Sequence, residues 1–276
     1  MSRHRGDRST QTDADGFRES ICRSLVSCAS PDSGSDSRPH SSLRDTSPEG
    51  HRAYFSLDTL RTLSVQLLTA LAFLHRHNIV HCDLKPQNVC IASVPRREFK
   101  IIDVGSAVLG HDVHFSYVQT RGYRAPEVML GLPWGDRVDM WGLGCILAEL
   151  VLGQHLFHGP SVEHVLVAQQ AVLGPLPEHM IRSAATHKLY FTQGALYTLD
   201  PPGHPPGAYR LLPIQTDLQT LLDVDDKEFL SFLSSLLCLD PDKRLTAEAA
   251  LEHPWLRPVG VPSVPTACAS PLARSP

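Results

Sequence analysis

The sequence predicts a mainly α fold with one short β-hairpin, and three stretches support that prediction. Leucines recur at helical spacing from Leu60 to Leu74, so one face of a helix there must be buried. Residues 138–152 are apolar nearly all round, which is typical of a helix at the centre of a core. Between these helices, two short apolar runs flank a turn, and this pattern predicts a hairpin over residues 89–103.

Other elements follow in order along the chain. Ser56 can cap the first long helix through its hydroxyl. Residues 161–182 predict a further helix, closed by glycine and prolines near its end, whereas the prolines and glycines of residues 199–213 indicate an irregular insert. Residues 225–239 show another helical apolar face, and Thr246 is placed to cap a short final helix.

The composition divides the chain of 276 residues into a folded region and two flanking segments. Residues 1–52 are rich in Ser, Arg, Asp, Gly and Pro, and we expect a disordered leader there because few large apolar side chains are available to bury. The hydrophobic content of 42% supports a sizeable core, which we place in residues 53–257. Residues 258–276 are mostly Pro, Ser and Ala and predict a disordered tail.

Charge and cysteine usage narrow the class of protein. A net charge of −4 gives no reason to expect nucleic acid or an anionic membrane as the main partner. The longest apolar stretch, residues 143–153, contains Glu149 and is too short to span a bilayer. Seven scattered cysteines without a C-x-x-C pair indicate reduced thiols in an intracellular protein, either cytoplasmic or nuclear.

Two tight turns on either side of the predicted hairpin carry polar side chains that can do chemistry. These residues are Asp83, Lys85, Asn88 and Asp103. Phosphoryl transfer from a nucleotide needs a carboxylate for the hydroxyl proton, a cation near the phosphate and oxygen ligands for magnesium. A turn with satisfied polar side chains would be the better interpretation of a lone His-x-Asp, but it does not account for the whole set.

The stretch from His81 to Gly105 resembles the catalytic loop and metal-binding turn of protein kinases, with Cys82 where Arg is usual and Val104 where Phe is usual. The resemblance implies a helical kinase C-lobe whose hairpin carries the two turns. It also implies that the chain binds ATP and Mg²⁺ and phosphorylates protein substrates.

The resemblance assigns roles to individual residues. Asp83 would be the general base, and Lys85 would stabilise the transferring phosphate. Asn88 and Asp103 would be magnesium ligands, and Cys90 would lie where kinases have an apolar floor under adenine, unless it is plain core packing.

Three further residues correspond to structural anchors of the kinase C-lobe. Ala125-Pro126-Glu127 resembles the end of a kinase activation segment. The resemblance implies that Glu127 pairs with the distant Arg244 and that Asp139 holds the backbone of the catalytic loop.

Residues 117–124, Tyr-Val-Gln-Thr-Arg-Gly-Tyr-Arg, resemble the activation segment of the dual-specificity tyrosine-regulated kinases, the DYRK family. Motifs between residues 134 and 177 are similar to the plant- and protist-type branch of that family. The resemblance implies that the kinase itself phosphorylates Tyr117, and Arg121 and Arg124 could receive that phosphate. The alternative is that Tyr117 is an ordinary loop tyrosine.

Residues 1–56 contain no G-x-G-x-x-G, no strand of the V-A-I-K type and no lysine, all of which the kinase N-lobe supplies. We therefore expect this chain to represent a C-lobe only, with weak or no activity by itself. Its N-lobe-facing surface, including Val104 and Cys90, should be exposed and partly apolar, which predicts either low solubility or a partner that covers it. The competing hypothesis is a non-catalytic docking module with a kinase-like fold.

Overall fold

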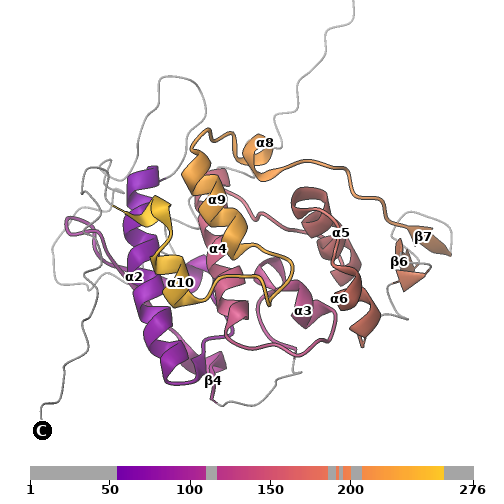
Figure 1. Ribbon diagram of the computed structural model, residues 1–276, viewed down its shortest axis with the longest axis horizontal. Coiled ribbons are helices and arrows are strands. Elements are labelled where there is room, and N and C mark those ends of the chain that lie inside the picture. The colour runs from indigo at the N-terminus through magenta and orange to yellow at the C-terminus, as the bar shows by residue number, and fades with distance from the viewer. Residues whose placement is uncertain (1–54, 110–116, 186–190, 193–194, 200–206, 258–276) are drawn as a thin grey trace, which may run out of the picture.

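The computed structural model describes residues 55–109, 117–185, 191–192, 195–199 and 207–257. Helices dominate this part of the chain, as predicted, and short β-hairpins lie at two edges (Figure 1). The predicted leader, residues 1–52, and the predicted tail, residues 258–276, lie outside the described residues.

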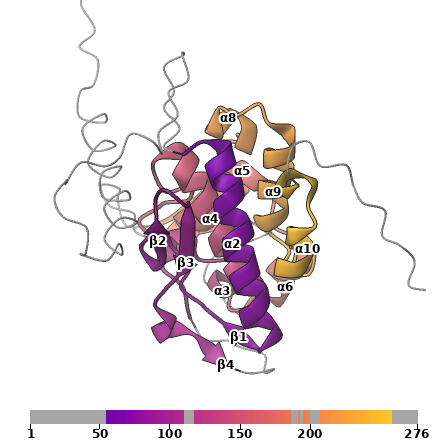
Figure 2. The same cartoon turned by 90° about the vertical axis from the view of Figure 1, so that its left-hand side faces the viewer.

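Helix α2 (Leu57–Arg76) is the first long element, and its predicted cap is confirmed because the Ser56 hydroxyl accepts a hydrogen bond from the Thr59 backbone N–H at 3.2 Å. Its leucine face is buried against the core, beside α10 (Ala247–Leu251) and the hairpin of residues 89–101 (Figure 2). The helix is long and apolar enough to cross a bilayer by length and composition, but helices of a soluble core pass the same test.

Helix α4 (Arg137–Leu152) runs through the centre of the core, and all its residues from Val138 to Val151 are buried. Gly144 lets α9 (Lys227–Leu236) approach closely, because a Cβ at this glycine would lie 2.8 Å from the Leu237 side chain. The polar residues Asp139 and Glu149 are also buried on α4, and each one needs partners there.

The predicted hairpin is confirmed as β2 (Val89–Ser93) paired antiparallel with β3 (Glu98–Ile101). A second pair, β1 (Ile79–Val80) with β4 (Val108–Leu109), was not expected from the sequence. Each of these strands has two residues, which is too short to show an alternating pattern.

The middle of the chain differs from its sequence-based expectation. The helix predicted over residues 161–182 is interrupted, because α5 (Val162–Leu173) ends at Gly174, which has a φ of +89°, and α6 (Glu178–Ser183) starts after Pro177. The insert expected to be irregular contains β7 (Ala208–Arg210). This strand pairs with β6 (Ala195–Leu199), which also pairs with β5 (Phe191–Thr192).

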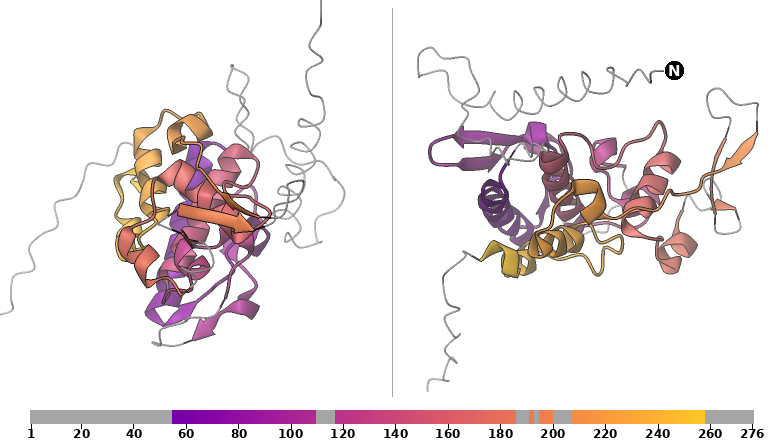
Figure 3. Two further views of the ribbon diagram at one scale, coloured as in Figure 1. Left: turned by 90° about the vertical axis from the view of Figure 1, so that its right-hand side faces the viewer. Right: turned by 90° about the horizontal axis from the view of Figure 1, so that it is seen from above.

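This small sheet lies at the opposite end of the molecule from α2, as two views show (Figures 1 and 3). Short helices complete the described part. They are α3 (Pro126–Met129), α8 (Leu218–Leu222) and the 3₁₀ turns η2 (Pro86–Asn88), η3 (Val104–Ser106), η4 (Arg121–Tyr123) and η5 (Pro254–Leu256).

A buried ion pair fastens α3 to the turn before α10. The Arg244 guanidinium donates two hydrogen bonds to the Glu127 carboxylate, at 2.6 and 2.9 Å, and both side chains are fully buried. Arg244 also donates to the Cys238 carbonyl and lies 5.1 Å from the ring centre of Trp141. The fork geometry of arginine therefore satisfies both carboxylate oxygens away from water.

We expect Arg244→Met to lower the free energy of unfolding by about 3–5 kcal/mol, because the change leaves the Glu127 carboxylate buried without its cation. Urea denaturation measures the effect. The matched control is Arg182→Met, whose exposed pair with Glu178 should contribute less than about 1 kcal/mol. Equal losses in the two variants would contradict this assignment.

Candidate active site

The loop from His81 to Lys85 is held from below by one buried carboxylate of α4. Asp139 accepts hydrogen bonds from the backbone N–H groups of His81 and Cys82, at 2.8 and 2.9 Å. Its third partner is His75, whose Nε2 lies 2.9 Å from Oδ2. Cys82 has a φ of +66°, a conformation that costs energy for a residue with a Cβ, and these bonds hold it in place.

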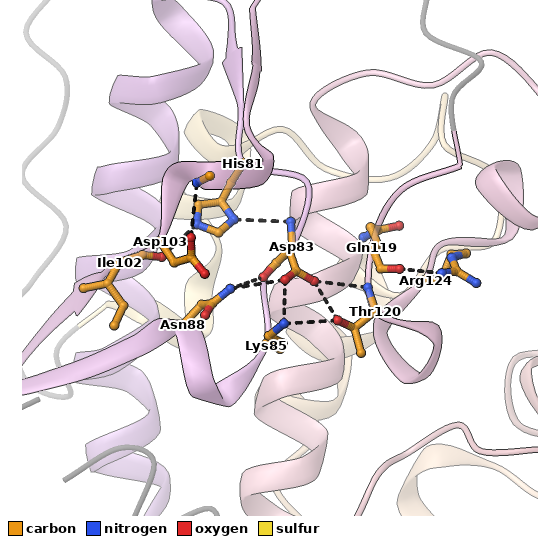
Figure 4. A network of polar contacts seen from close by, with 10 residues as sticks. His81, Asp83, Lys85, Asn88, Ile102, Asp103, Gln119, Thr120 and Arg124 are labelled. Carbon is orange, nitrogen blue, oxygen red and sulfur yellow. Dashed lines mark hydrogen bonds and ion pairs between the residues drawn. The ribbon is translucent and has the colours of Figure 1, made fainter. Parts of the chain in front are cut away.

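Asp83 lies at the centre of the polar contacts that follow (Figure 4). Its Oδ1 accepts hydrogen bonds from the Thr120 hydroxyl at 2.7 Å and the Thr120 backbone N–H at 3.1 Å. Its Oδ2 accepts a hydrogen bond from Lys85 Nζ at 2.6 Å. Lys85 Nζ also donates to the Thr120 hydroxyl at 3.2 Å, so each of the three side chains is hydrogen-bonded to the other two.

These contacts control the ionisation of Asp83. Partial burial raises the pKa of its carboxyl, but the hydrogen bonds from Lys85 and Thr120 and the charge of Lys85 outweigh burial, so the pKa lies below its ordinary value. The side chain is a carboxylate at neutral pH. It can therefore accept a hydrogen bond from a hydroxyl group that approaches from solvent.

Asn88 and His81 connect this carboxylate to the hairpin. Asn88 Nδ2 donates to the Asp83 carbonyl at 2.8 Å, which leaves its amide oxygen available to a cation. His81 Nε2 lies 3.1 Å from the Ile102 carbonyl, and its Nδ1 accepts from the Asp83 N–H, so we assign the proton to Nε2. The catalytic loop and the end of β3 are thereby joined.

Asp103 follows β3 in the left-handed conformation, with a φ of +62°, and its side chain is exposed. One carboxylate oxygen accepts from the Gly105 N–H at 3.2 Å. In the described part of the chain, no group of three or more His, Cys, Asp or Glu side chains could hold a metal. Two oxygen ligands from Asn88 and Asp103 nevertheless fit Mg²⁺, which keeps several waters and shares the oxygens of phosphates.

The activation segment predicted around Tyr117 lies beside the catalytic loop. The Arg124 guanidinium donates to the Tyr117 hydroxyl and lies 3.8 Å from the centre of its ring. It also donates to the carbonyls of Val118 and Gln119, at 2.7 and 2.5 Å. Arg121 is not part of this group, because its guanidinium donates to the Pro160 carbonyl at 3.0 Å.

The protein kinase domain family matches residues 38–256 of this sequence. The chain belongs to the protein kinase family. It is 37% identical over 225 residues to a putative dual specificity tyrosine-phosphorylation-regulated kinase 3 homolog of Drosophila melanogaster, covering 74% of this chain and 26% of that protein. It is 36% identical over 207 residues to the human dual specificity tyrosine-phosphorylation-regulated kinase 4, covering 73% and 38%.

A further relative is the serine/threonine-protein kinase ppk5 of Schizosaccharomyces pombe, with 37% identity over 217 residues. The match covers 78% of this chain and 26% of that protein. The predicted resemblance to the DYRK family is therefore confirmed, and the chain spans well under half the length of these relatives. The plant- and protist-type branch stays a prediction.

Three positions near the site differ in their exposure to solvent. Cys90 is only 7% exposed, so the expectation that it lies on an exposed surface is wrong; it lies on β2, whose first three residues are all buried. Val104 is 61% exposed, as expected. Burial and the charge of Asp139 raise the pKa of the Cys82 thiol to about 12, which makes this neighbour of Asp83 a poor nucleophile.

Sequence reasoning assigned no role to Thr120, Gln119 or Tyr123. Thr120 binds Asp83, and the Gln119 side chain donates to the Val138 carbonyl at 2.9 Å. The buried Tyr123 hydroxyl donates to Glu149 and lies 3.1 Å from His155 Nδ1; burial, followed by Glu149, raises its pKa. These partners are distant in sequence and leave no spacing pattern that could reveal them.

We expect Lys85→Met to raise the pKa of the Asp83 carboxyl, because the variant loses a hydrogen bond and a positive charge. A carbon-detected NMR titration of the carboxyl group measures this. In the parent chain, Asp83 stabilises the fold above its unfolded pKa of about 3.9, and that contribution is lost as the pH falls through the lower folded value.

Arg96→Met is the control for this titration, because Arg96 pairs with Glu98 on an exposed part of the hairpin. It should leave the Asp83 titration unchanged. An Asp83 carboxyl that titrates identically in Lys85→Met and the parent chain would refute the role given to Lys85.

Proposed function

We propose that the protein transfers the γ-phosphate of ATP to serine or threonine hydroxyls of other proteins. The observation that carries the proposal is the placement of Asp83, whose ionised carboxylate is held between Lys85 and Thr120 beside the ends of the hairpin. Relatives named serine/threonine-protein kinase and dual specificity kinase support the same reaction class. An intracellular setting, in the cytoplasm or the nucleus, is part of the proposal.

In this reaction the substrate hydroxyl donates a hydrogen bond to Asp83, which orients its oxygen towards the phosphorus and takes its proton. The bond from phosphorus to the bridging oxygen of ADP breaks as the new bond to the hydroxyl oxygen forms. Lys85 Nζ, 2.6 Å from Asp83 Oδ2, places a positive charge where the transferring phosphoryl group would lie. Asn88 and Asp103 would hold Mg²⁺, which neutralises the phosphate charge when bound.

The surface above these residues is where the remaining parts of an ATP site would have to lie. Val104, which directly follows Asp103, is 61% exposed. Large exposed apolar side chains beside a polar site indicate a surface that is covered in the working protein. We propose that a phosphate-binding lobe or partner covers it, and that the 276-residue chain alone is weak or inactive because residues 1–56 lack a glycine-rich loop and a lysine.

The activation segment also suggests a substrate preference. A peptide whose hydroxyl reaches Asp83 must pass Thr120, because Thr120 binds that carboxylate. Gln119 has a φ of +69°, and its carbonyl already accepts a hydrogen bond from the charged Arg124 guanidinium at 2.5 Å, which makes it a poorer acceptor for the backbone N–H of the next substrate residue. Proline has no N–H to leave unpaired, and we therefore propose that it is favoured directly after the phosphorylated residue.

The non-catalytic docking module is the alternative function. It needs no ionised Asp83 and no Lys85 beside it, and no structural feature of the described residues favours it over the enzyme. A simple test distinguishes the two functions, because a docking module would still bind its partner protein when Asp83 is changed.

We expect Asp83→Asn to lower magnesium-dependent phosphorylation of a generic Ser/Thr substrate by about 10²–10⁴-fold, because the base is lost. Radiolabel transfer from ATP is measured on the longest product of the gene and on the 276-residue chain. The shorter chain should be the weaker kinase. Lys100→Met, an exposed change on the hairpin, is the control. Full activity of Asp83→Asn would overturn the proposed function, and robust activity of the 276-residue chain would overturn the need for a covering lobe.

We expect peptides with Ser-Pro to be phosphorylated with a kcat/KM about tenfold above that of matched Ser-Ala peptides, because an unpaired N–H costs about 1–3 kcal/mol. Initial rates over a range of peptide concentrations measure the ratio. Equal values for the two peptides would show that the Gln119 carbonyl does not select the substrate.

A further inference from the structure

One glutamine of α2 binds the outer edge of strand β3. Gln66 Nε2 donates to the Arg97 carbonyl at 2.8 Å, and Gln66 Oε1 accepts from the Phe99 N–H at 2.8 Å. These two backbone groups flank Glu98, so a single side-chain amide satisfies the pair of groups that a residue of a neighbouring parallel strand would bind. Gln66 thus takes the place of a third strand beside the two-stranded β2–β3 sheet.

The position of this contact along the hairpin is informative. The pairing of β2 with β3 shifts register between Ile91 and Ser93, opposite Phe99 and Glu98. Between that point and the site, the pairs Val89–Ile101, Cys90–Lys100 and Ile91–Phe99 are regular, so the regular ladder ends at Phe99. Gln66 binds β3 at the same place, from the side that β2 does not cover. Helix α2 therefore holds β3 at the end where the pairing within the hairpin becomes irregular.

A second contact between α2 and the hairpin turn is weaker. Arg97 pairs with Asp58 at 2.5 Å, but their side chains are 43% and 66% exposed, so water screens the pair. Phe99 is 5% exposed, and its N–H would be left without a partner if the Gln66 amide were removed. The Gln66 amide is therefore the stronger of these two polar contacts between α2 and the hairpin.

The same strand ends at the proposed magnesium ligands. From Phe99, β3 runs to Ile101, and the next residue, Ile102, donates its N–H to the Asn88 carbonyl at 3.0 Å. Asn88 begins the hairpin and Asp103 follows it, so a displacement of β3 changes the spacing between the two ligands. His81 also binds the Ile102 carbonyl, which transmits the same displacement to the catalytic loop.

We propose that Gln66 is a positioning residue that anchors the start of β3 to α2 and, through the strand, holds the spacing of Asn88 and Asp103. The part that concerns the metal rests on the proposed function. Gln66 does not touch the site itself; its effect passes along the strand from Phe99 to Ile102.

The test compares Gln66→Met with the parent 276-residue chain. Methionine keeps the length and the helix propensity of glutamine but can bind neither backbone group. Hydrogen exchange reports on the Phe99 and Ile102 amides, and paramagnetic broadening by Mn²⁺ reports on cation binding beside Asn88 and Asp103. We expect at least tenfold faster exchange at Phe99 and about tenfold weaker Mn²⁺ binding.

Two further variants make the result specific. Thr69→Val removes an exposed hydrogen bond within α2 itself, to the Val65 carbonyl, and should change neither exchange at Phe99 nor Mn²⁺ binding. Gln66→Glu keeps the acceptor for the Phe99 N–H but loses the donor to Arg97, so its effect should be intermediate.

The outcomes separate this proposal from the proposed function. If Gln66→Met leaves exchange at Phe99 and Ile102 unchanged, or if Thr69→Val has the same effects, Gln66 is not a positioning residue. If exchange rises but Mn²⁺ binding is unchanged, Gln66 anchors the strand but does not position the ligands, and the proposal fails for the site. If Asp103→Asn binds Mn²⁺ as the parent does, the metal ligands under the proposed function are wrong, and hydrogen exchange alone tests whether Gln66 anchors β3.

Discussion

The arrangement of the site depends on one buried carboxylate. Asp139 is fully buried, and burying a charge is costly unless hydrogen bonds replace its hydration. The N–H groups of His81 and Cys82 supply those bonds, together with His75. The same bonds hold Cys82 in a left-handed conformation that it would not otherwise keep, and this turn presents Asp83 to solvent. The hydrogen bonds that offset the cost of burying Asp139 thus also fix the backbone of the catalytic loop.

The first turn of α4 holds the activation segment as well as the catalytic loop. Asp139 binds the loop, and the neighbouring Val138 carbonyl accepts a hydrogen bond from the Gln119 side chain. Gln119 Oε1 in turn accepts from the Ala125 N–H, and Thr120 beside it binds Asp83. Two adjacent residues of one buried helix therefore place the base and the segment that a substrate must pass. Because α4 is packed on all sides, the catalytic base and the activation segment are both held by the same rigid helix.

The sequence predicted the parts of the structure whose causes are local. Ser56 caps α2 because its hydroxyl lies directly before the first turn of that helix. The hairpin forms because its two apolar runs are close together in the chain. The contact of Thr120 with Asp83 joins residues 37 positions apart, and no spacing pattern in the sequence predicts it. Strands of two residues cannot show a period, so β1 and β4 were missed. The burial of Cys90 depends on tertiary packing, which a motif position does not specify.

The contacts of Arg124 bear on what a phosphate at Tyr117 would do, a modification that only the family resemblance implies. Arg124 already binds the Tyr117 hydroxyl and the carbonyls of Val118 and Gln119. Burial lowers its pKa, yet an arginine stays charged in proteins, so a partly buried cation faces this tyrosine. A phosphate would bring negative charge to a guanidinium that is already in place. Its physical effect would then be to strengthen an arrangement of the segment that exists beforehand, rather than to create a new one.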